Sequence, residues 1–416
     1  MVAAVLILAS RGTAVLAGHE ESAPPAGISA ARPSAAAAGT YHIDPTAGDD
    51  AHDGRSPERP LKTWSQRRFS PGDTVLFKRG SVIRGVLEAC NGKPGAPVTY
   101  GAYGEGHKPV FLGSIAAGDP DLWVEERPFV WRFTGRLESE VCNVIFNDGE
   151  SCGILRWNLG DLQIAGDWHC TGLGTGRRIE EKAAPATTDG GVLYLFAPVN
   201  PGRAWRSIEC ALWGKRRLVG ADRDVVIENL GFRNAGVHGY RGDDVRRVVI
   251  RDCEFRFIGG AVWDRQKKMR LGNGIEFWYG AEDVTVERCV IDNVYDSGIT
   301  HQGGQTHHIP RRLFFRDNLF VDCGLSTYES REPAGEVWFE HNTSINAGGG
   351  FSRQGENPPR RTDPYPQPVG YHVMIWLIDG GTQPGPIHVR DNIFCGGSGA
   401  AISAIIEPDD LRKFDF

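Results

Sequence analysis

The sequence predicts an all-β fold, a right-handed parallel β-helix in which short strands stack coil upon coil. The first observation is a phrase of eight residues that recurs six times, beginning at positions 225, 248, 284, 313, 337 and 387. Each copy alternates apolar and polar residues, as a half-buried strand does, and the copies lie 23, 36, 29, 24 and 50 residues apart. A unit of 23–24 residues interrupted by insertions is typical of a solenoid whose coils bury their faces only against their neighbours.

The second observation is the residue at one equivalent place in each copy, where the chain is expected to turn. These residues should stack from coil to coil: Leu230, Cys253, Cys289, Asn318, Asn342 and Asn392. Asparagines buried in such a turn can hydrogen-bond backbone groups of the adjacent coils. Cys253 and Cys289 should be neighbours that serve packing, because a buried free cysteine behaves as a small hydrophobe and no Cys/His spacing typical of zinc is present.

Composition and charge exclude a nucleic-acid partner. The chain of 416 residues has a formal net charge of −6, and its most basic segment is RQKKMR at 265–270, which we expect to be a solvated insertion loop. The nine cysteines are an odd number. If the chain is exported, one disulfide among Cys142, Cys152 and Cys170 is an open alternative.

The N-terminus resembles an export signal. Residues 1–17 hold the short apolar core VAAVLILA followed by small residues at 15–17, and this run is far shorter than the ~20 residues that a membrane-spanning helix needs. Residues 18–39 are rich in Ala, Pro, Ser and Gly and are expected to form a linker. We therefore expect a secreted or periplasmic protein without a membrane span.

Residues 40–112 carry a second signature: YHIDPTAGDDAHDGRSPERPLKTW, PGDTVLFKRGSVIRG and PGAPVTYGAYGEGHKPVFLGS. This segment resembles the N-terminal coils of secreted right-handed parallel β-helix proteins of the pectate-lyase-like superfamily, and the resemblance implies a carbohydrate-active protein. We expect an N-terminal cap and the first coils here. The acidic stretch within it lacks the spacing of an EF-hand, so a turn-rich capping loop is favoured over a calcium site.

Residues 113–223 are less regular and are predicted to form an inserted β-rich segment. Six tryptophans fall in it: Trp123, Trp131, Trp157, Trp168, Trp205 and Trp213. Such rings can stack on sugars, but core packing is the commoner role and is the expectation here. The remaining coils, with the candidate site, occupy 224–416.

A further strand precedes most copies of the repeat, and these strands predict one outer face. They are GVHGY (236–240), GIEFW (274–278), GITHQ (298–302), GLSTY (324–328) and VMIWL (373–377). Their first apolar residues, Val237, Ile275, Ile299 and Leu325, should form an interior ladder. Because side chains alternate faces, two outward columns are expected: His238, Glu276, Thr300 and Ser326, then Tyr240, Trp278, Gln302 and Tyr328. Insertions at 259–273 and 348–372 could wall a cleft over them.

The carboxylates near these columns are the candidate catalytic residues. Glu276 is favoured as general acid, because a neighbouring indole such as Trp278 should raise the pKa of a carboxyl. Its partner is Asp296 or Glu329. Asp296 is expected ~13 Å along the sheet from Glu276, which exceeds the ~5–9.5 Å of glycosidase carboxyl pairs. The substrate-binding candidates are His238, Tyr240, Trp278, Thr300, Gln302 and Tyr328, whereas His301 should point inward.

Three function classes remain open. A glycoside hydrolase would use two of the three carboxylates and is favoured, with a polysaccharide or oligosaccharide as substrate and no cofactor. A polysaccharide lyase or uronate epimerase would need a base such as His238 or Tyr240, with a calcium ion or another cation for the uronate. The third class is a noncatalytic carbohydrate-binding or surface β-helix. The chain lacks the NTD, DD, GHG and RIK set of polygalacturonases.

Two expectations concern the whole chain. We expect a monomer. The sequence closes on EPDDLRKFDF (407–416) without an obvious cap, and an uncapped coil exposes strand edges. A truncated sequence or a further domain is therefore an open alternative.

Overall fold

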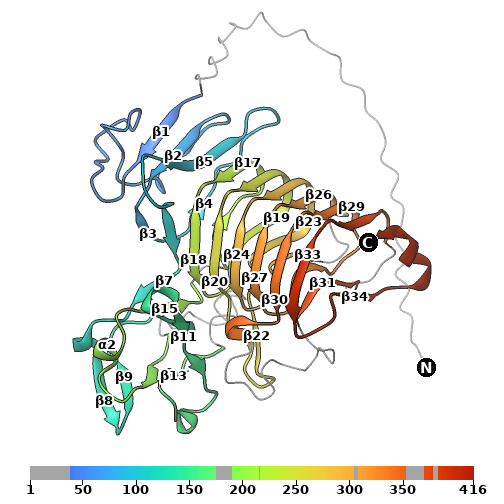
Figure 1. Ribbon diagram of the computed structural model, residues 1–416. Coiled ribbons are helices and arrows are strands. Elements are labelled where there is room, and N and C mark those ends of the chain that lie inside the picture. The colour runs from blue at the N-terminus through green and yellow to red at the C-terminus, as the bar shows by residue number, and fades with distance from the viewer. Residues whose placement is uncertain (1–37, 175–189, 215, 304–307, 353–369, 378–382) are drawn as a thin grey trace, which may run out of the picture. The chain divides into compact units, whose positions relative to one another are not determined.

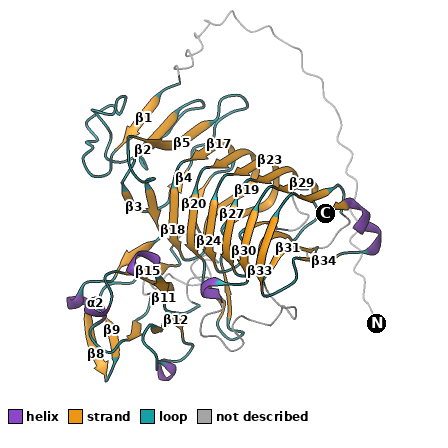
Figure 2. Cartoon of the chain, viewed as in Figure 1, coloured by secondary structure: helices purple, strands orange, loops and turns teal. Residues whose placement is uncertain are grey.

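The computed structural model describes residues 38–174, 190–214, 216–303, 308–352, 370–377 and 383–416, and residues 38–416 belong to one compact unit. The predicted signal (1–17) and nearly all of the linker (18–39) lie outside the described residues. Within this unit the chain winds through three parallel sheet faces, and strands dominate the ribbon (Figure 2). The predicted fold class, an all-β right-handed parallel β-helix, is confirmed.

The first face carries the candidate site. Its strands, in order, are β4 (Leu87–Glu88), β16 (Arg217–Gly220), the first half of β19 (His238–Arg251), the first half of β23 (Ile275–Glu287), β25 (Ile299–Gln302), β28 (Ser326–Ser330), β31 (Tyr371–Trp376) and β34 (Ile402–Ile405). All these pairings are parallel. Strands β19 and β23 are long because each continues through the corner into the second face.

The second and third faces complete each coil. The second contains β1 (Thr40–Ile43), β2 (Thr74–Lys78), β5 (Val98–Tyr103), β17 (Arg223–Glu228), the second halves of β19 and β23, β26 (Arg311–Arg316), β29 (Gly335–Glu340), β32 (Ile387–Arg390) and β35 (Phe414–Asp415). The third contains β3 (Val82–Arg84), β6 (Val110–Leu112), β18 (Gly231–Ala235), β20 (Glu254–Ile258), β24 (Val290–Val294), β27 (Leu319–Cys323), β30 (Thr343–Ala347) and β33 (Ile393–Gly397). Figure 1 shows β18, β20, β24, β27, β30 and β33 side by side in chain order.

Each repeat phrase spans the corner between the second and third faces. The residue just before the ladder position has a positive φ in all six copies: Asn229, Asp252, Arg288, Asp317, His341 and Asp391. The residue four places after the ladder position also has a positive φ in all six copies: Asn234, Phe257, Asn293, Asp322, Asn346 and Gly396. Left-handed conformations favour Asn, Asp and Gly, which explains why these types recur at fixed places in the repeat.

The predicted ladder is confirmed. Asn342 Oδ1 accepts hydrogen bonds from the backbone N–H of Asn318 at 3.0 Å and from its Nδ2 at 3.0 Å, while Asn342 Nδ2 donates to the Phe315 carbonyl at 2.8 Å. Asn392 repeats these contacts one coil later. Buried amides thus satisfy the turn backbone of successive coils. All nine cysteines are free, which corrects the alternative of a disulfide among Cys142, Cys152 and Cys170.

The core of the coils is filled by the inward residues of the three faces. Aromatic rings stack along it, for example Phe111 on Phe232 and Phe232 on Phe255, with centroids 5.5 and 5.1 Å apart. Such offset pairs add to the stabilisation that burial of the rings gives. Two adjacent ladder cysteines, Cys253 and Cys289, are buried in the same core, and their thiols donate to the backbone carbonyls of Arg251 at 3.2 Å and Glu287 at 3.4 Å.

The predicted insertion forms two further sheets. One contains β11 (Ser151–Cys152), β10 (Val141–Phe146), β15 (Ile208–Leu212) and β7 (Ser114–Ala116); the other contains β12 (Ile154–Leu155), β13 (Asp167–Cys170), β14 (Leu193–Phe196), β9 (Val130–Phe133) and β8 (Trp123–Arg127). Trp123 and Trp168 are buried in their shared core, and Trp131, Trp157 and Trp205 pack against it. Five of the six tryptophans therefore fill a core, as expected. Trp213 belongs to a separate cluster described below.

Short helices and one hairpin complete the described structure. The helices are η1 (Pro120–Leu122), η2 (Asn147–Gly149), η3 (Leu159–Asp161), α2 (Pro201–Ala204), η4 (Gly350–Ser352) and η5 (Pro408–Lys413). The hairpin joins β21 (Ala261–Asp264) to β22 (Met269–Leu271). It contains the RQKKMR segment, of which 265–268 are exposed as predicted, whereas Arg270 is buried. None of the helices in the described part is long and apolar enough to cross a membrane.

Candidate active site

A cavity of about 210 Å³ lies over the first face. Strands β19, β23, β25 and β28 contribute to its floor, and the β21–β22 hairpin and the segment around Trp213 contribute to its walls. All three candidate carboxylates, Glu276, Asp296 and Glu329, line this one cavity. The predicted separation of ~13 Å along the sheet between Asp296 and Glu276 therefore does not keep them in different sites.

Stacked glycines set the register of the floor. The backbone N–H of Tyr240 donates to the Gly274 carbonyl at 2.9 Å, and that of Ile275 donates to the Gly298 carbonyl at 2.9 Å. A Cβ added at Gly239 or Gly274 would come within 2.5 or 2.6 Å of the next coil's carbonyl oxygen, so no side chain fits there. Gly239, Gly274 and Gly298 consequently lie in one row.

This register differs from the expected one by three residues in two strands. Arg241, not His238, lies level with Glu276, and Glu329, not Ser326, lies level with Thr300. The prediction aligned the strands on the apolar residue that follows the first glycine of each. The backbone hydrogen bonds instead align the three-residue pattern polar–glycine–apolar at 238–240, 273–275 and 297–299. An odd shift exchanges the two faces of a strand.

The exchange of faces corrects four expectations. Tyr240 and Tyr328 are fully buried in the core and are not sugar platforms. The Tyr240 hydroxyl donates to the Ala221 carbonyl at 2.6 Å, and the Tyr328 hydroxyl lies 3.0 Å from His301 Nε2. Val237 and Leu325, expected in the interior ladder, line the cavity instead. The inward position of His301 is confirmed.

Glu276 is the centre of a buried hydrogen-bond network. Its Oε1 accepts from Asn273 Nδ2 at 3.2 Å and from Gln302 Nε2, and its Oε2 faces His238 Nε2 at 3.0 Å and Arg241 Nη1 at 3.4 Å. A carboxylate has about four lone-pair sites, and these four donors occupy them. Burial raises the pKa of Glu276, and Arg241, Asn273 and Gln302 oppose that rise.

His238 is held in one neutral form by its two neighbours. Its Nδ1 accepts the backbone N–H of Asn273 at 3.2 Å, so the proton is on Nε2, where it donates to Glu276. Burial lowers the pKa of His238 well below its usual range, and the charges of Arg241 and Arg216 act in the same direction. With both nitrogens engaged, His238 positions Glu276 and is not a free base.

Glu329 lies in a different environment. Its Oε2 accepts from Ser297 Oγ at 2.8 Å and its Oε1 accepts from Trp376 Nε1 at 2.8 Å. Burial raises the pKa of the Glu329 carboxyl, Arg331 opposes this, and the negative charge of Asp296 adds to it. Two neutral donors leave about two of its four lone-pair sites for a proton or a substrate.

Thr300 separates the two glutamates on the floor. It lies on β25 between Glu276 on β23 and Glu329 on β28, at the same level. Strands two apart place the two Cα atoms about 9.6 Å from each other. Thr300 is fully buried, and its Oγ1 has no hydrogen-bond partner among the residues with described placement.

Aromatic and basic side chains complete the cavity, and the basic ones were not expected. Trp278 is half-buried beneath Arg241, whose Cζ lies 4.8 Å from the ring centroid. Arg216 and Arg331 also line the cavity, and Arg331 Nη1 donates to Gln302 Oε1 at 2.9 Å. None of these arginines is among the site residues predicted from the sequence. Arg241 was missed because the expected register of its strand was wrong by three residues, so it was not placed level with Glu276. Arg331 was missed because it lies beyond the end of the predicted strand at 324–328.

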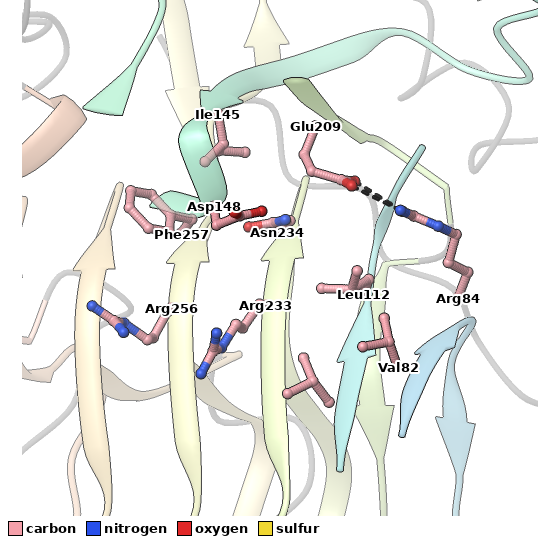
Figure 3. Close-up of a pocket in the computed structure, with 11 residues that line it drawn as sticks. Val82, Arg84, Leu112, Ile145, Asp148, Glu209, Arg233, Asn234, Arg256 and Phe257 are labelled. Atoms are coloured by element: carbon pink, nitrogen blue, oxygen red, sulfur yellow. Dashed lines mark hydrogen bonds and ion pairs between the residues drawn. The ribbon is translucent and has the colours of Figure 1, made fainter. Parts of the chain in front are cut away.

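A second cavity, of about 260 Å³, opens between the third face and the insertion (Figure 3). Its arginines are paired on partly exposed surfaces: Arg84 with Glu209 at 2.7 Å, Arg233 with Glu254 at 2.8 Å, and Arg256 with Asp292 at 2.7 Å. Its charged groups thus neutralise one another at the surface. The cavity on the first face, with its buried carboxylates, is the better candidate for catalysis.

The acidic N-terminal stretch contains hydrogen-bonded turns. Asp44 accepts the backbone N–H groups of Thr46 and Ala47 at 3.0 Å and pairs with Lys78 at 2.7 Å, so its oxygens hold the turn. In the part of the chain that the structure describes, no group of three or more His, Cys, Asp and Glu side chains is arranged to hold a metal ion.

Comparisons with known proteins add little beyond this geometry. No family model matches the sequence, and no curated protein matches it. Solved structures that it resembles include a glycoside hydrolase (11% identity, 90% of each chain, TM-score 0.48), XylC with xylose (13%, 74% of this chain and 68% of that one, 0.40) and the pectate lyase Pel9A (13%, 88% and 77%, 0.37). At these values the likeness carries no argument about the reaction, which has to come from the site.

Proposed function

We propose that this chain is a glycoside hydrolase that cleaves a polysaccharide or oligosaccharide in the cavity on the first face. The observation that carries the proposal is the environment of Glu329. A buried carboxyl beside a second carboxylate, Asp296, is held toward its protonated form, and its free lone-pair sites allow it to meet a substrate oxygen. A general acid in glycoside hydrolysis needs both properties.

In this proposal the three carboxylates have different roles. Glu329 donates a proton to the leaving glycosidic oxygen, and Asp296 is the second carboxylate, acting as base or nucleophile. Glu276, favoured from the sequence as the acid, instead orients Arg241, Gln302 and His238, because its lone-pair sites are filled. Trp278 supplies an apolar surface for a sugar ring. Hydrolysis by two carboxylates uses no cofactor.

Residues 1–17 support an exported protein, secreted or periplasmic, which fits a polysaccharide substrate met outside the cytoplasm. The chain is further proposed to act as a monomer.

The second candidate is a polysaccharide lyase, favoured by the three arginines that line the cavity. Arg216, Arg241 and Arg331 could neutralise the carboxylate of a uronate. Against it, the bases expected from the sequence are occupied: both nitrogens of His238 are engaged, and the Tyr240 hydroxyl is buried in the core. The hydrolase therefore remains the better reading.

One screen separates these candidates. The full chain is incubated with neutral and uronic polysaccharides, and reducing ends are measured alongside the ultraviolet absorbance of unsaturated products. A hydrolase produces reducing ends without that absorbance, whereas a lyase produces both together. Binding without either signal in the whole set would contradict an enzymatic role and indicate a carbohydrate-binding β-helix.

A further inference from the structure

We infer that the cavity accepts a single sugar unit at the end of a chain, so that cleavage is exo-acting; this rests on the proposed hydrolase function. The cavity of about 210 Å³ is smaller than the 300–1,000 Å³ typical of pockets that enclose a drug-sized ligand. An enzyme that cuts within a polysaccharide needs an open groove for several sugar units on both sides of the scissile bond. Two built walls replace that groove here.

The first wall stands at the β19 end of the floor. Trp213 and Val237, which both line the cavity, pack with Cys142, Ala261 and the half-buried Leu271. The backbone N–H of Trp213 donates to the Glu140 carbonyl at 3.0 Å, which fastens this wall to the insertion.

The hairpin is fixed to the same wall. Arg270, at its base, is 3% exposed, donates from Nη2 to the Cys142 carbonyl at 2.9 Å, and lies with its Cζ 4.5 Å from the ring centroid of Tyr295. The backbone N–H of Val262 donates to Glu140 Oε1 at 3.2 Å. A hairpin held by a buried arginine and by backbone contacts is a permanent wall.

The second wall stands at the β28 end. Leu325 lines the cavity and packs with Tyr371, Met374 and Trp376. Met374 lies level with Glu329 on the next strand and is 1% exposed. The polar column of the floor, Arg241, Glu276, Thr300 and Glu329, therefore ends on a buried methionine, which offers no polar group to a further sugar.

The floor between the walls is short. From Arg241 to Glu329 it spans three strand spacings, about 14 Å between the outer Cα atoms. Glu329, the proposed proton donor, stands at one end of it, directly against the second wall. The bound unit thus lies on the floor, and the remainder of the substrate leaves through the open side of the cavity.

Binding tests the inference independently of turnover. In the full-length Glu329→Gln variant, mono-, di- and tetrasaccharides of each sugar in the screen are titrated by calorimetry. A single-unit pocket predicts that the mono- and disaccharide bind with dissociation constants within about threefold of that of the tetrasaccharide. Affinity that rises tenfold or more between di- and tetrasaccharide would show a groove and overturn the inference. Absence of binding by every sugar would overturn both the inference and the proposed function.

Products test it in the active chain. Exo-action releases one small product from the first time point, with viscosity of the polymer falling slowly relative to the growth of reducing ends. A rapid fall in viscosity with mixed long products would overturn exo-action while leaving the hydrolase proposal intact. The wall variant Leu271→Ala should increase the share of longer products at least twofold, and the matched control Leu411→Ala, at an exposed site in η5, should not.

Discussion

Glu276 and Glu329 stand at the same level of one sheet face with one strand between them, and of the two only Glu276 has its oxygens fully engaged by donors. Glu329 accepts two hydrogen bonds, both from uncharged groups. The two glutamates thus share a backbone position and differ in what surrounds it. This difference divides the roles: a saturated carboxylate fixes its neighbours, and an unsaturated one is available for proton transfer.

The variant Glu276→Gln tests the first role. An amide cannot accept from four donors, and its NH₂ would face Asn273, Gln302 or Arg241. Among the residues that the structure describes, Arg241 would keep only the exposed Asp243 as an ion-pair partner. Removing one partner of a buried ion pair costs about 3 kcal/mol or more, so we expect a loss of that size in the free energy of unfolding, measured by urea denaturation.

The control for this variant is Asp243→Asn, which removes the exposed partner of the same arginine. An exposed pair contributes about 0–1 kcal/mol, so this change should be small. Equal losses in the two variants would contradict the idea that Glu276 anchors the network. A positioning role also predicts that Glu276→Gln lowers kcat without removing a limb of the pH–rate profile.

The repeat determined how much of the fold could be predicted. Side-chain chemistry at the corner is local: a residue with positive φ is favourably Asn, Asp or Gly, and the next residue stacks on its copies, so both leave a pattern in the sequence. The positions of Asn318, Asn342 and Asn392 were therefore correct. The signal predicted at 1–17 and nearly all of the linker predicted at 18–39 lie outside the described residues and remain expectations.

The site was less predictable, because its register depends on contacts between coils. Gly236 and Gly239 each precede one large apolar or aromatic residue, Val237 or Tyr240, and the close approach of Gly239 to the Gly274 carbonyl selects between them. Because the prediction used Gly236, it placed Tyr240 on the outer face and did not place Arg241 there. The wall contributed by Trp213 could not be inferred either, since it depends on how the insertion folds back.

Asn342→Ala should destabilise the coils strongly. Asn342 is buried, and its loss leaves the Phe315 carbonyl and the Asn318 backbone N–H without their partners. An unsatisfied buried group costs about 1–3 kcal/mol, so a loss of about 3 kcal/mol is expected in chemical denaturation. The control is Asn392→Ala, at a half-buried position, where water can replace part of the contact. A larger effect at Asn392 than at Asn342 would refute the argument.

His301 should make stability fall in acid. It is fully buried beside the Tyr328 hydroxyl, and burial lowers its pKa to about 3. The unfolded chain, with a histidine pKa near 6.5, binds the proton more readily, so stability present above pH 6.5 is lost as pH falls toward 3. The expected slope is about 1.4 kcal/mol for each pH unit.

Unfolding free energies at pH 4.5, 5.5 and 6.5 measure this slope. His301→Gln removes the titrating group and should reduce the slope of the unfolding free energy against pH by about 1.4 kcal/mol per pH unit, the contribution of one proton. This holds whatever the effect of the substitution on stability at pH 7. His341→Gln, at an exposed histidine, is the matched control and should leave the slope unchanged. If His301→Gln behaves like that control, the histidine does not titrate as argued.

Glu329→Gln tests the proton donor. Burial raises the pKa of Glu329, so wild-type activity that needs the protonated carboxyl should extend above the usual range of a glutamate and fall as pH rises through the raised pKa. The amide keeps the shape and the contacts to Ser297 and Trp376 can partly persist, but it donates no proton. Turnover of substrates with a poor leaving group should fall about 100-fold or more, and the high-pH limb of the profile should disappear. In aryl glycosides with an acidic phenol, the phenolate leaves without needing a proton. The rate of bond cleavage for these substrates should therefore fall far less, measured as the first turnover in rapid-mixing experiments.

Asp296→Asn is the informative comparison, because it removes the second carboxylate and should slow cleavage of both kinds of substrate equally. If Glu329→Gln slows cleavage of both kinds of substrate equally, Glu329 is not the general acid. If Asp296→Asn leaves cleavage of both kinds unchanged, the second catalytic carboxylate is another residue.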